Sequence, residues 1–239
     1  MPPLAPLPDS PAARARVRTV DSFAGLLATP FAAGVNALCW PRALPGDFDE
    51  IVRLLGPGEE IDNLDEARLL ALPLSPAGQA ARDVLLADLR LLRDHGLAPE
   101  LNLIHAYRRD DPTATVPTDV CSFHADSSPI ETSTWLCTYA GPASEGLANE
   151  EAQRKVDDPA IRAALRQEYG GADDDGFADF LHENCYDLHY AMRPGARPYG
   201  FGQFHLWRIA VDWPGSPVPP CVHRAPEQQP GEKRLLLIS

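Results

Sequence analysis

The chain has 239 residues and a formal net charge of −13, and its hydrophobic fraction of 44% is ordinary for a globular protein, which excludes global disorder. Nucleic acids and anionic membranes call for a basic surface, and the sequence contains no basic stretch, so we expect neither as a partner. The acidic composition mainly predicts a soluble protein.

The first 20 residues are rich in Pro and Ala and lack the continuous apolar run of a signal peptide, so we interpret them as a flexible arm. Residues 21–239 are expected to form a single domain, as a monomer or a homodimer. No stretch approaches the roughly 20 apolar residues of a membrane span. The five cysteines are odd in number and form no CxxC pair, which favours reduced thiols and a cytoplasmic location.

Short elements are expected in the N-terminal half. Residues 35–40 form an apolar run closed by Pro41 and are predicted to be a strand or a buried turn. Apolar residues at helical spacing predict a helix over 47–55, ended by Gly-Pro-Gly. A longer helix is predicted over 79–95, with Gly96 as its stop. We expect this helix to pack on one face of the core.

The C-terminal half is dominated by strand patterns interrupted by helical ones. Asp158 and Pro159 are suited to the N-cap and the first position of a helix that runs to about residue 169. A second helix is expected over 176–185, so residues 148–195 form a helical insertion. The predicted strands are 101–107, 120–123, 132–139, 203–211 and 234–238. This order predicts an α+β protein with an antiparallel sandwich or barrel.

The residues that carry chemistry begin with Phe-His-Ala-Asp at 123–126. In a strand, residues i and i+2 point to the same face, so His124 and Asp126 present an imidazole nitrogen and a carboxylate oxygen on one side. His223 lies 97 residues after Asp126, ahead of the last strand. Two histidines and one carboxylate that leave other positions open are typical of non-haem iron(II) oxygenases. Arg234 follows His223 by 11 residues, and its guanidinium can bind a carboxylate bidentately.

This pattern resembles that of the iron(II)/2-oxoglutarate-dependent dioxygenases, in which an HxD…H triad is followed by a basic residue about ten positions on. The strings FHAD, TWLCTYAGPASEG, VHRAP and RLLLI, together with the earlier GVNALCW, resemble a bacterial family of uncharacterised proteins within that superfamily. The resemblance covers roughly residues 31–56 and 100–239. It implies a double-stranded β-helix core of the jelly-roll or cupin-like type, accompanied by the N-terminal helices and the helical insertion.

The resemblance also implies the ligands and the reaction. His124, Asp126 and His223 match the Fe(II) ligands, and Arg234 matches the residue that binds the distal carboxylate of 2-oxoglutarate. With O₂, 2-oxoglutarate would be decarboxylated to succinate, and the substrate would be hydroxylated, desaturated or cyclised. Tyr139 is a candidate for a hydrogen bond to this co-substrate, or else a core aromatic residue.

Four further residues are candidates for contact with the substrate. Asn102 and Tyr107 lie on opposite faces of the predicted strand over 101–107, and either face can look into the barrel. Arg208 lies in an apolar strand and needs an anionic partner, which is either a substrate carboxylate or a structural aspartate. Glu145 either binds a substrate amine or caps a turn. These charges favour an amino-acid-like small molecule or a peptide as the substrate.

Two other functions remain compatible with the same residues. A cupin-like enzyme would use zinc or manganese in the triad for non-oxidative chemistry, with Arg234 binding the substrate itself. A non-catalytic protein would hold the metal or a metabolite for regulation. His182 and His189 are a rival metal pair, but on one helix they would lie two turns apart, which is too far for one ion.

Overall fold

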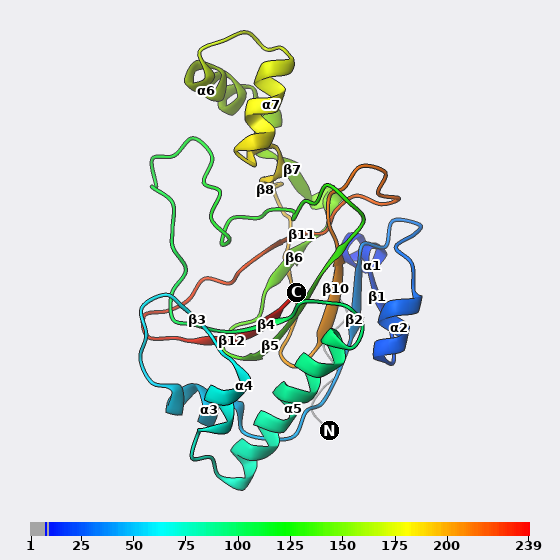
Figure 1. Ribbon diagram of the computed structural model, residues 1–239. Helices are drawn as coiled ribbons and strands as arrows, with labels where there is room; N and C mark the ends of the chain where they lie inside the picture. Colours follow the sequence, from blue (N-terminus) through cyan, green and yellow to red (C-terminus); the bar gives the residue numbers. More distant parts are fainter. Residues whose placement is uncertain (1–7, 9) are drawn as a thin grey trace.

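The computed structural model describes residue 8 and residues 10–239 as an α+β fold (Figure 1). At its centre is a mixed seven-stranded sheet with the strand order β1-β2-β10-β5-β12-β4-β3, and a smaller antiparallel sheet has the order β11-β6-β9. The larger sheet consists of β1 (Val17–Thr19), β2 (Ala37–Trp40), β3 (Ile61–Asn63), β4 (Glu100–Ile104), β5 (Ser133–Ala140), β10 (Leu206–Ala210) and β12 (Arg234–Ile238). The smaller one consists of β6 (Glu145–Leu147), β9 (Tyr199–Gly200) and β11 (Val222–Arg224).

Helices α3 and α5 cover one face of the larger sheet (Figure 1). The predicted helix over 79–95 is confirmed as α5, with an earlier start. The Ser75 hydroxyl accepts a hydrogen bond from the Gly78 amide, and Pro76 occupies the first turn, so both residues favour initiation there. The helices before β4 are α1 (Pro11–Arg16), α2 (Phe23–Ala28), α3 (Phe48–Leu55), α4 (Glu66–Leu70) and α5 (Pro76–Arg93).

The two faces of the larger sheet are buried against different material. Along β5, Trp135 and Tyr139 belong to the core beneath α3 and α5. Residues of the opposite parity, such as Leu136, point away from these helices into a cavity. Strand β12 alternates in the same way: Leu235 lies in the helix-side core and Leu236 lines the cavity. This alternation is the ordinary period of two along a strand.

The strands pair in a nested order. Strand β4 pairs with β12, β5 with β10, and β6 with β9, all antiparallel. The segment 123–125 joins β11 through an antiparallel bridge between His124 and His223. The predicted strand over 120–123 is wrong in its position: residues 119–122 form a turn, and the strand-like pairing begins only at Phe123. Asp119 stabilises this turn by accepting a hydrogen bond from the Cys121 amide.

The insertion forms a lobe that projects from the rest of the fold (Figure 1). The Asp158 carboxylate caps α6 as predicted, accepting hydrogen bonds from the amides of Ala160 and Ile161. The lobe has a small core of its own, centred on Leu165 and Phe177. Its elements are η1 (Asn149–Glu151), β7 (Ala152–Arg154), η2 (Lys155–Asp157), α6 (Pro159–Tyr169), α7 (Asp175–Glu183), η3 (Tyr186–Leu188) and β8 (Tyr190–Met192).

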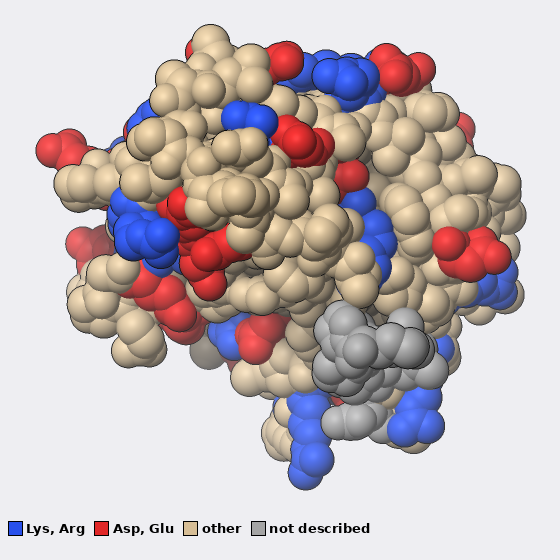
Figure 2. Space-filling view, turned by 90° about the horizontal axis from the view of Figure 1, so that it is seen from below, with Lys and Arg blue, Asp and Glu red and all other residues tan. Residues whose placement is uncertain are grey.

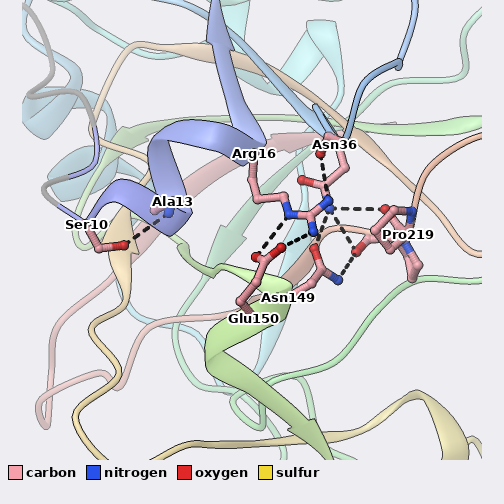
Figure 3. A network of polar contacts seen from close by, with 9 residues as sticks. Ser10, Ala13, Arg16, Asn36, Asn149, Glu150 and Pro219 are labelled. Carbon is pink, nitrogen blue, oxygen red and sulfur yellow. Dashed lines mark hydrogen bonds and ion pairs between the residues drawn. The ribbon is translucent and has the colours of Figure 1, made fainter.

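Only part of the predicted N-terminal arm, residues 1–20, is described by the structure. Residues 1–7 and 9 lie outside the described residues. From Ser10 on, the prediction of a flexible arm is wrong, because Ser10 caps α1 and both Ala13 and Val17 are buried. Figure 3 shows one contact of this segment, the ion pair of Arg16 with Glu150 at the base of the insertion.

Charged side chains of both signs lie on the surface (Figure 2). On the face shown in Figure 2, acidic and basic side chains are intermixed and separated by wide uncharged areas. Within the described part of the chain, no helix combines the length and the apolar character that crossing a bilayer demands.

Candidate metal centre

Three side chains far apart in sequence meet at one point. One ligand atom from each of His124, Asp126 and His223 lies within 4.8 Å of the other two. Nε2 of His124 is 3.8 Å from Oδ1 of Asp126, and Nε2 of His223 is 3.7 Å from Oδ2 of Asp126. These separations are too long for hydrogen bonds, so neither Nε2 is engaged by the carboxylate. Within the described residues, this is the one group of three or more His, Cys, Asp or Glu side chains with such geometry.

Backbone pairing brings the two histidines together. The His124 amide donates to the His223 carbonyl at 2.9 Å, and the His223 amide donates back to the His124 carbonyl at 2.8 Å. Residues paired in this way lie directly opposite each other with their side chains on the same face. On its other edge the segment is bound by the insertion, because the Ala125 amide donates to the Leu188 carbonyl and the Tyr190 amide to the Phe123 carbonyl. The segment that carries His124 is therefore hydrogen-bonded along both of its edges.

The hydrogen bonds of the two rings leave the same atom free. Nδ1 of His124 lies 2.8 Å from the Ser122 carbonyl, and Nδ1 of His223 lies 3.2 Å from the Cys221 carbonyl. Each Nδ1 must carry the proton in order to donate, which leaves Nε2 as the unprotonated metal-binding atom. The Thr134 hydroxyl donates to Oδ2 of Asp126 and orients that carboxylate.

The electrostatics of the site favour the metal-binding protonation states. Burial, followed by the neighbouring His223, lowers the pKa of His124 to about 4. Burial by itself would raise the pKa of Asp126, but His223, the Thr134 hydroxyl and His124 outweigh it, so the net shift is downward. At neutral pH, His124 is therefore neutral and Asp126 is an anion.

A cavity of about 220 Å³ connects the triad to Arg234. Arg234 is only 1% exposed, and its terminal nitrogens donate to three hydroxyls, those of Tyr107 (2.7 Å), Thr138 (3.0 Å) and Ser144 (2.6 Å). Its Nε has no hydrogen-bond partner, and no described carboxylate forms an ion pair with it. Burial lowers the pKa of Arg234, although the side chain stays charged. A buried cation with only neutral partners is suited to an anionic ligand.

Lys233 does not compete for this position. Its ammonium donates to the Gly56 carbonyl, outside the cavity. The donor set fits the group that the sequence implies: two imidazole nitrogens and one carboxylate suit a divalent metal, and the guanidinium suits the far end of a dicarboxylate.

Two of the predicted substrate residues reach the cavity. Asn102 and Tyr107 both line it, although the predicted strand placed them on opposite faces. Strand β4 ends at Ile104, and the amides of His105 and Ala106 both donate to the Glu60 carbonyl. This turn ends the alternation, so Tyr107 faces the same cavity as Asn102.

Tyr139 does not take the place predicted for it. Its ring is buried on the helix side of β5, where it stacks on Phe48, and its hydroxyl donates to Asp88. The reason is strand parity: Tyr139 shares the face of Trp135, which the helices cover. A co-substrate in the cavity cannot contact it.

The two charged substrate candidates are also used elsewhere. Glu145 pairs with Arg224, whose Nε lies 2.8 Å from the carboxylate. Arg208 donates to the carbonyls of Leu26 and Thr29 at the end of α2, and its guanidinium lies over the Phe31 ring. Carbonyls at a helix C-terminus supply the partial negative charge that this cation needs. Neither residue lines the cavity.

Three residues that contact the site were not predicted from the sequence. Thr134 and Thr138 contact Asp126 and Arg234, and the alternation of 132–139 contained the signal, because they share the parity opposite to Trp135. Ser144 also accepts a hydrogen bond from Arg234. The rival pair is not formed: His182 is exposed beside Asp187, whereas His189 is buried with its ring stacked 5.8 Å from that of His124.

Comparison with protein-family models, curated proteins and solved structures gives no match to this chain. Inference about its function therefore starts from the chemistry of the site.

Proposed function

We propose that this protein is a non-haem Fe(II)/2-oxoglutarate-dependent oxygenase. The observation that carries the proposal is a single cavity with a His-Asp-His triad in one part of its wall and a buried, carboxylate-free guanidinium in another. Either feature alone occurs in other contexts. Together they fit a co-substrate that binds a metal through one end and presents an anion at the other.

The strand pairing supports a double-stranded β-helix core for the proposed enzyme. Eight segments are involved, in the order β4, 123–125, β5, β6, β9, β10, β11 and β12. The first pairs with the last, the second with the seventh, the third with the sixth and the fourth with the fifth. Nested antiparallel pairing of this kind is that of a jelly roll. It brings the HxD segment and the distal histidine together as neighbours.

Each residue has a definite part in the proposed reaction. His124, Asp126 and His223 would hold Fe(II), which supplies O₂ activation when it is bound together with 2-oxoglutarate. Arg234 would bind the distal carboxylate through its terminal nitrogens, and the hydroxyls of Tyr107, Thr138 and Ser144 orient the guanidinium. Thr134 keeps the Asp126 carboxylate in place.

The cavity walls would exclude water from the reacting groups. The expected outcome is hydroxylation of the substrate, and desaturation or ring closure belong to the same class of chemistry.

The proposal is tested by ligand binding without oxygen. Anaerobic Fe(II) and 2-oxoglutarate should together give a visible absorption band with the protein. Arg234→Gln should weaken 2-oxoglutarate binding by roughly 10- to 100-fold, the effect of losing a charged hydrogen-bonding group. Lys233→Gln is the matched control, because Lys233 lies outside the cavity, and it should change the affinity less than about twofold.

A ligand that lacks the distal carboxylate keeps the test independent of folding defects. In the unmodified protein, 2-oxopentanoate should bind at least about tenfold more weakly than 2-oxoglutarate. In Arg234→Gln the two should bind equally. If 2-oxoglutarate neither binds nor yields succinate, the oxygenase proposal is wrong. Activity with zinc or manganese in the absence of O₂ would identify a cupin-like enzyme with non-oxidative chemistry instead.

A further inference from the structure

The two ends of the metal cavity differ in chemistry. At one end Arg234 is surrounded by hydroxyls, including those of Tyr107 and Ser144. Strand β5 leads away from this end. Thr138 contacts Arg234, Leu136 follows on the same face, and Thr134 contacts Asp126. Leu136 is therefore the residue of β5 that lies between the guanidinium and the metal carboxylate.

Aliphatic side chains of the cavity wall also reach the surface. Ile61, Val120 and Ile238 line the cavity and are 53%, 42% and 36% exposed. They come from β3, from the turn before His124 and from the end of β12, with Ile61 in the row of Arg234 and Ile238 in the row of Leu136. Exposed aliphatic groups gathered at a cavity are typical of a surface that binds an apolar ligand.

Charged groups other than the metal triad and Arg234 do not line the cavity among the described residues, in a chain with 34 acidic and 21 basic residues. An ammonium or carboxylate bound between Leu136 and Ile238 would lose its hydration without gaining a partner. The two side chains once expected to recognise such charges, Arg208 and Glu145, are used elsewhere.

We propose that the substrate presents an uncharged aliphatic group to the metal and that the exposed side chains of Ile61, Val120 and Ile238 bind its hydrocarbon part. This inference rests on the proposed oxygenase function for the reaction, but not for the polarity of the site. 2-Oxoglutarate lies between Arg234 and the metal, across Leu136, and the hydrocarbon part of the substrate lies against the exposed aliphatic side chains. Charged groups of the substrate, such as those of a free amino acid, stay outside the opening.

The test uses three probes of equal length: 6,6,6-trifluorohexan-1-ol, the corresponding amine and the corresponding carboxylate. Their binding is followed by the broadening of the ¹⁹F resonance. The protein is first metal-free and then loaded with Zn(II) and 2-oxoglutarate, which occupies the Arg234 end without turnover. In the loaded protein the alcohol should bind at least about tenfold more tightly than either ion. Shortening the alcohol should weaken binding by about fourfold for each methylene removed.

Substitutions at two residues of nearly equal exposure, Ile61 and Leu70, show where the alcohol binds. Ile61→Asp introduces a charge at the opening and should weaken binding of the alcohol at least about tenfold. Leu70→Asp is the control, because Leu70 is 52% exposed in α4 and does not line the cavity. It should change the affinity less than about twofold. Val120→Asp provides a second site in a turn, in case the substitution in the edge strand β3 disturbs folding.

The outcomes separate this inference from the oxygenase proposal. If 2-oxoglutarate fails to bind but the alcohol binds metal-free protein with the expected dependence on Ile61, only the oxygenase proposal is overturned. If 2-oxoglutarate binds and the charged probes bind as well as the alcohol, or Ile61→Asp and Leu70→Asp behave alike, the apolar substrate is ruled out. The same holds if Ile61→Asp dissociates an oligomer and leaves the alcohol affinity unchanged, since the aliphatic residues would then serve self-association.

Discussion

The chemistry of the triad depends on contacts made by individual atoms. A histidine is a ligand only when the correct nitrogen is unprotonated, and in both His124 and His223 a backbone carbonyl two residues earlier accepts from Nδ1. Burial then keeps His124 neutral over a wide pH range. Spacing in the sequence identified these residues, whereas their protonation states follow from the folded environment.

The metal-free protein should lose stability as the pH falls from about 6.5 towards 4. His124 has a pKa of about 4 in the folded protein, while in the unfolded chain its pKa is about 6.5. The unfolded chain therefore binds the extra proton in this window, and the loss amounts to about 2 kcal/mol. Urea unfolding at about pH 7 and about pH 4.5, with a chelator present, measures it.

The matched variant for this measurement is His124→Gln. His189 and His205 also have pKa values lowered by burial and act in the same window, so the difference between the two proteins isolates His124. An equal pH dependence in the variant would mean that His124 is not held neutral. Asp126 belongs to a lower window, because its pKa is depressed below its ordinary value and its contribution is lost only at more acidic pH.

At the scale of elements, β5 carries two functions on its two faces. Its helix side holds Tyr139, whose hydroxyl donates to the Asp88 carboxylate, and Arg42 also donates to Asp88 at 2.7 Å. Its cavity side holds Thr134 and Thr138, which contact Asp126 and Arg234. The same strand therefore stabilises the core and supports the proposed site, and parity decides which residue does which.

Two Tyr→Phe substitutions should separate these roles. Tyr139→Phe leaves one oxygen of Asp88 without its donor, so the free energy of unfolding should fall by about 1–3 kcal/mol. The affinity for 2-oxoglutarate should change less than about twofold, because the ring lies outside the cavity. Tyr107→Phe removes a partner of Arg234 and should weaken 2-oxoglutarate binding by roughly three- to tenfold. Calorimetric titration and urea unfolding of both variants check this, and equal effects on affinity would contradict the assignment of faces.

At the scale of the whole molecule, a polar network joins segments that are distant in sequence. The buried Asn36 amide donates to Asn149 at the base of the insertion and to the carbonyls of Pro219 and Pro220, which precede β11 (Figure 3). Asn149 donates to Pro220 as well. The N-terminal segment, the insertion and the approach to His223 are thus held together at one point.

Asn36→Ala should therefore destabilise the protein although it is remote from the metal ligands. Removal of the amide leaves buried acceptors unpaired, and the free energy of unfolding should fall by about 1–3 kcal/mol. Asn63→Ala is the control, since Asn63 is exposed and makes one long hydrogen bond of 3.4 Å. It should change the stability by less than about 0.5 kcal/mol. Urea unfolding compares the two, and similar losses would argue against a network that joins these segments.

Features with a local cause could be predicted from the sequence. The capping residues of α5 and α6 act within one helical turn, and the parity of His124 and Asp126 needs only the period of a strand. The end of β4 was not predictable in this way, because it depends on hydrogen bonds from His105 and Ala106 to Glu60. Those bonds join residues more than 40 positions apart.

By itself, the sequence determined the candidate ligands, the α+β class and the position of the insertion, because periodicity and capping depend on neighbours along the chain. Only the tertiary structure decided that His223 lies opposite His124, that no carboxylate of the described residues pairs with Arg234, and that Tyr139 belongs to the core. The physical reason is that both faces of the larger sheet are buried, one beneath helices and the other around the cavity. A strand buried on both sides has apolar residues at both parities, so its sequence does not reveal which face meets the ligand.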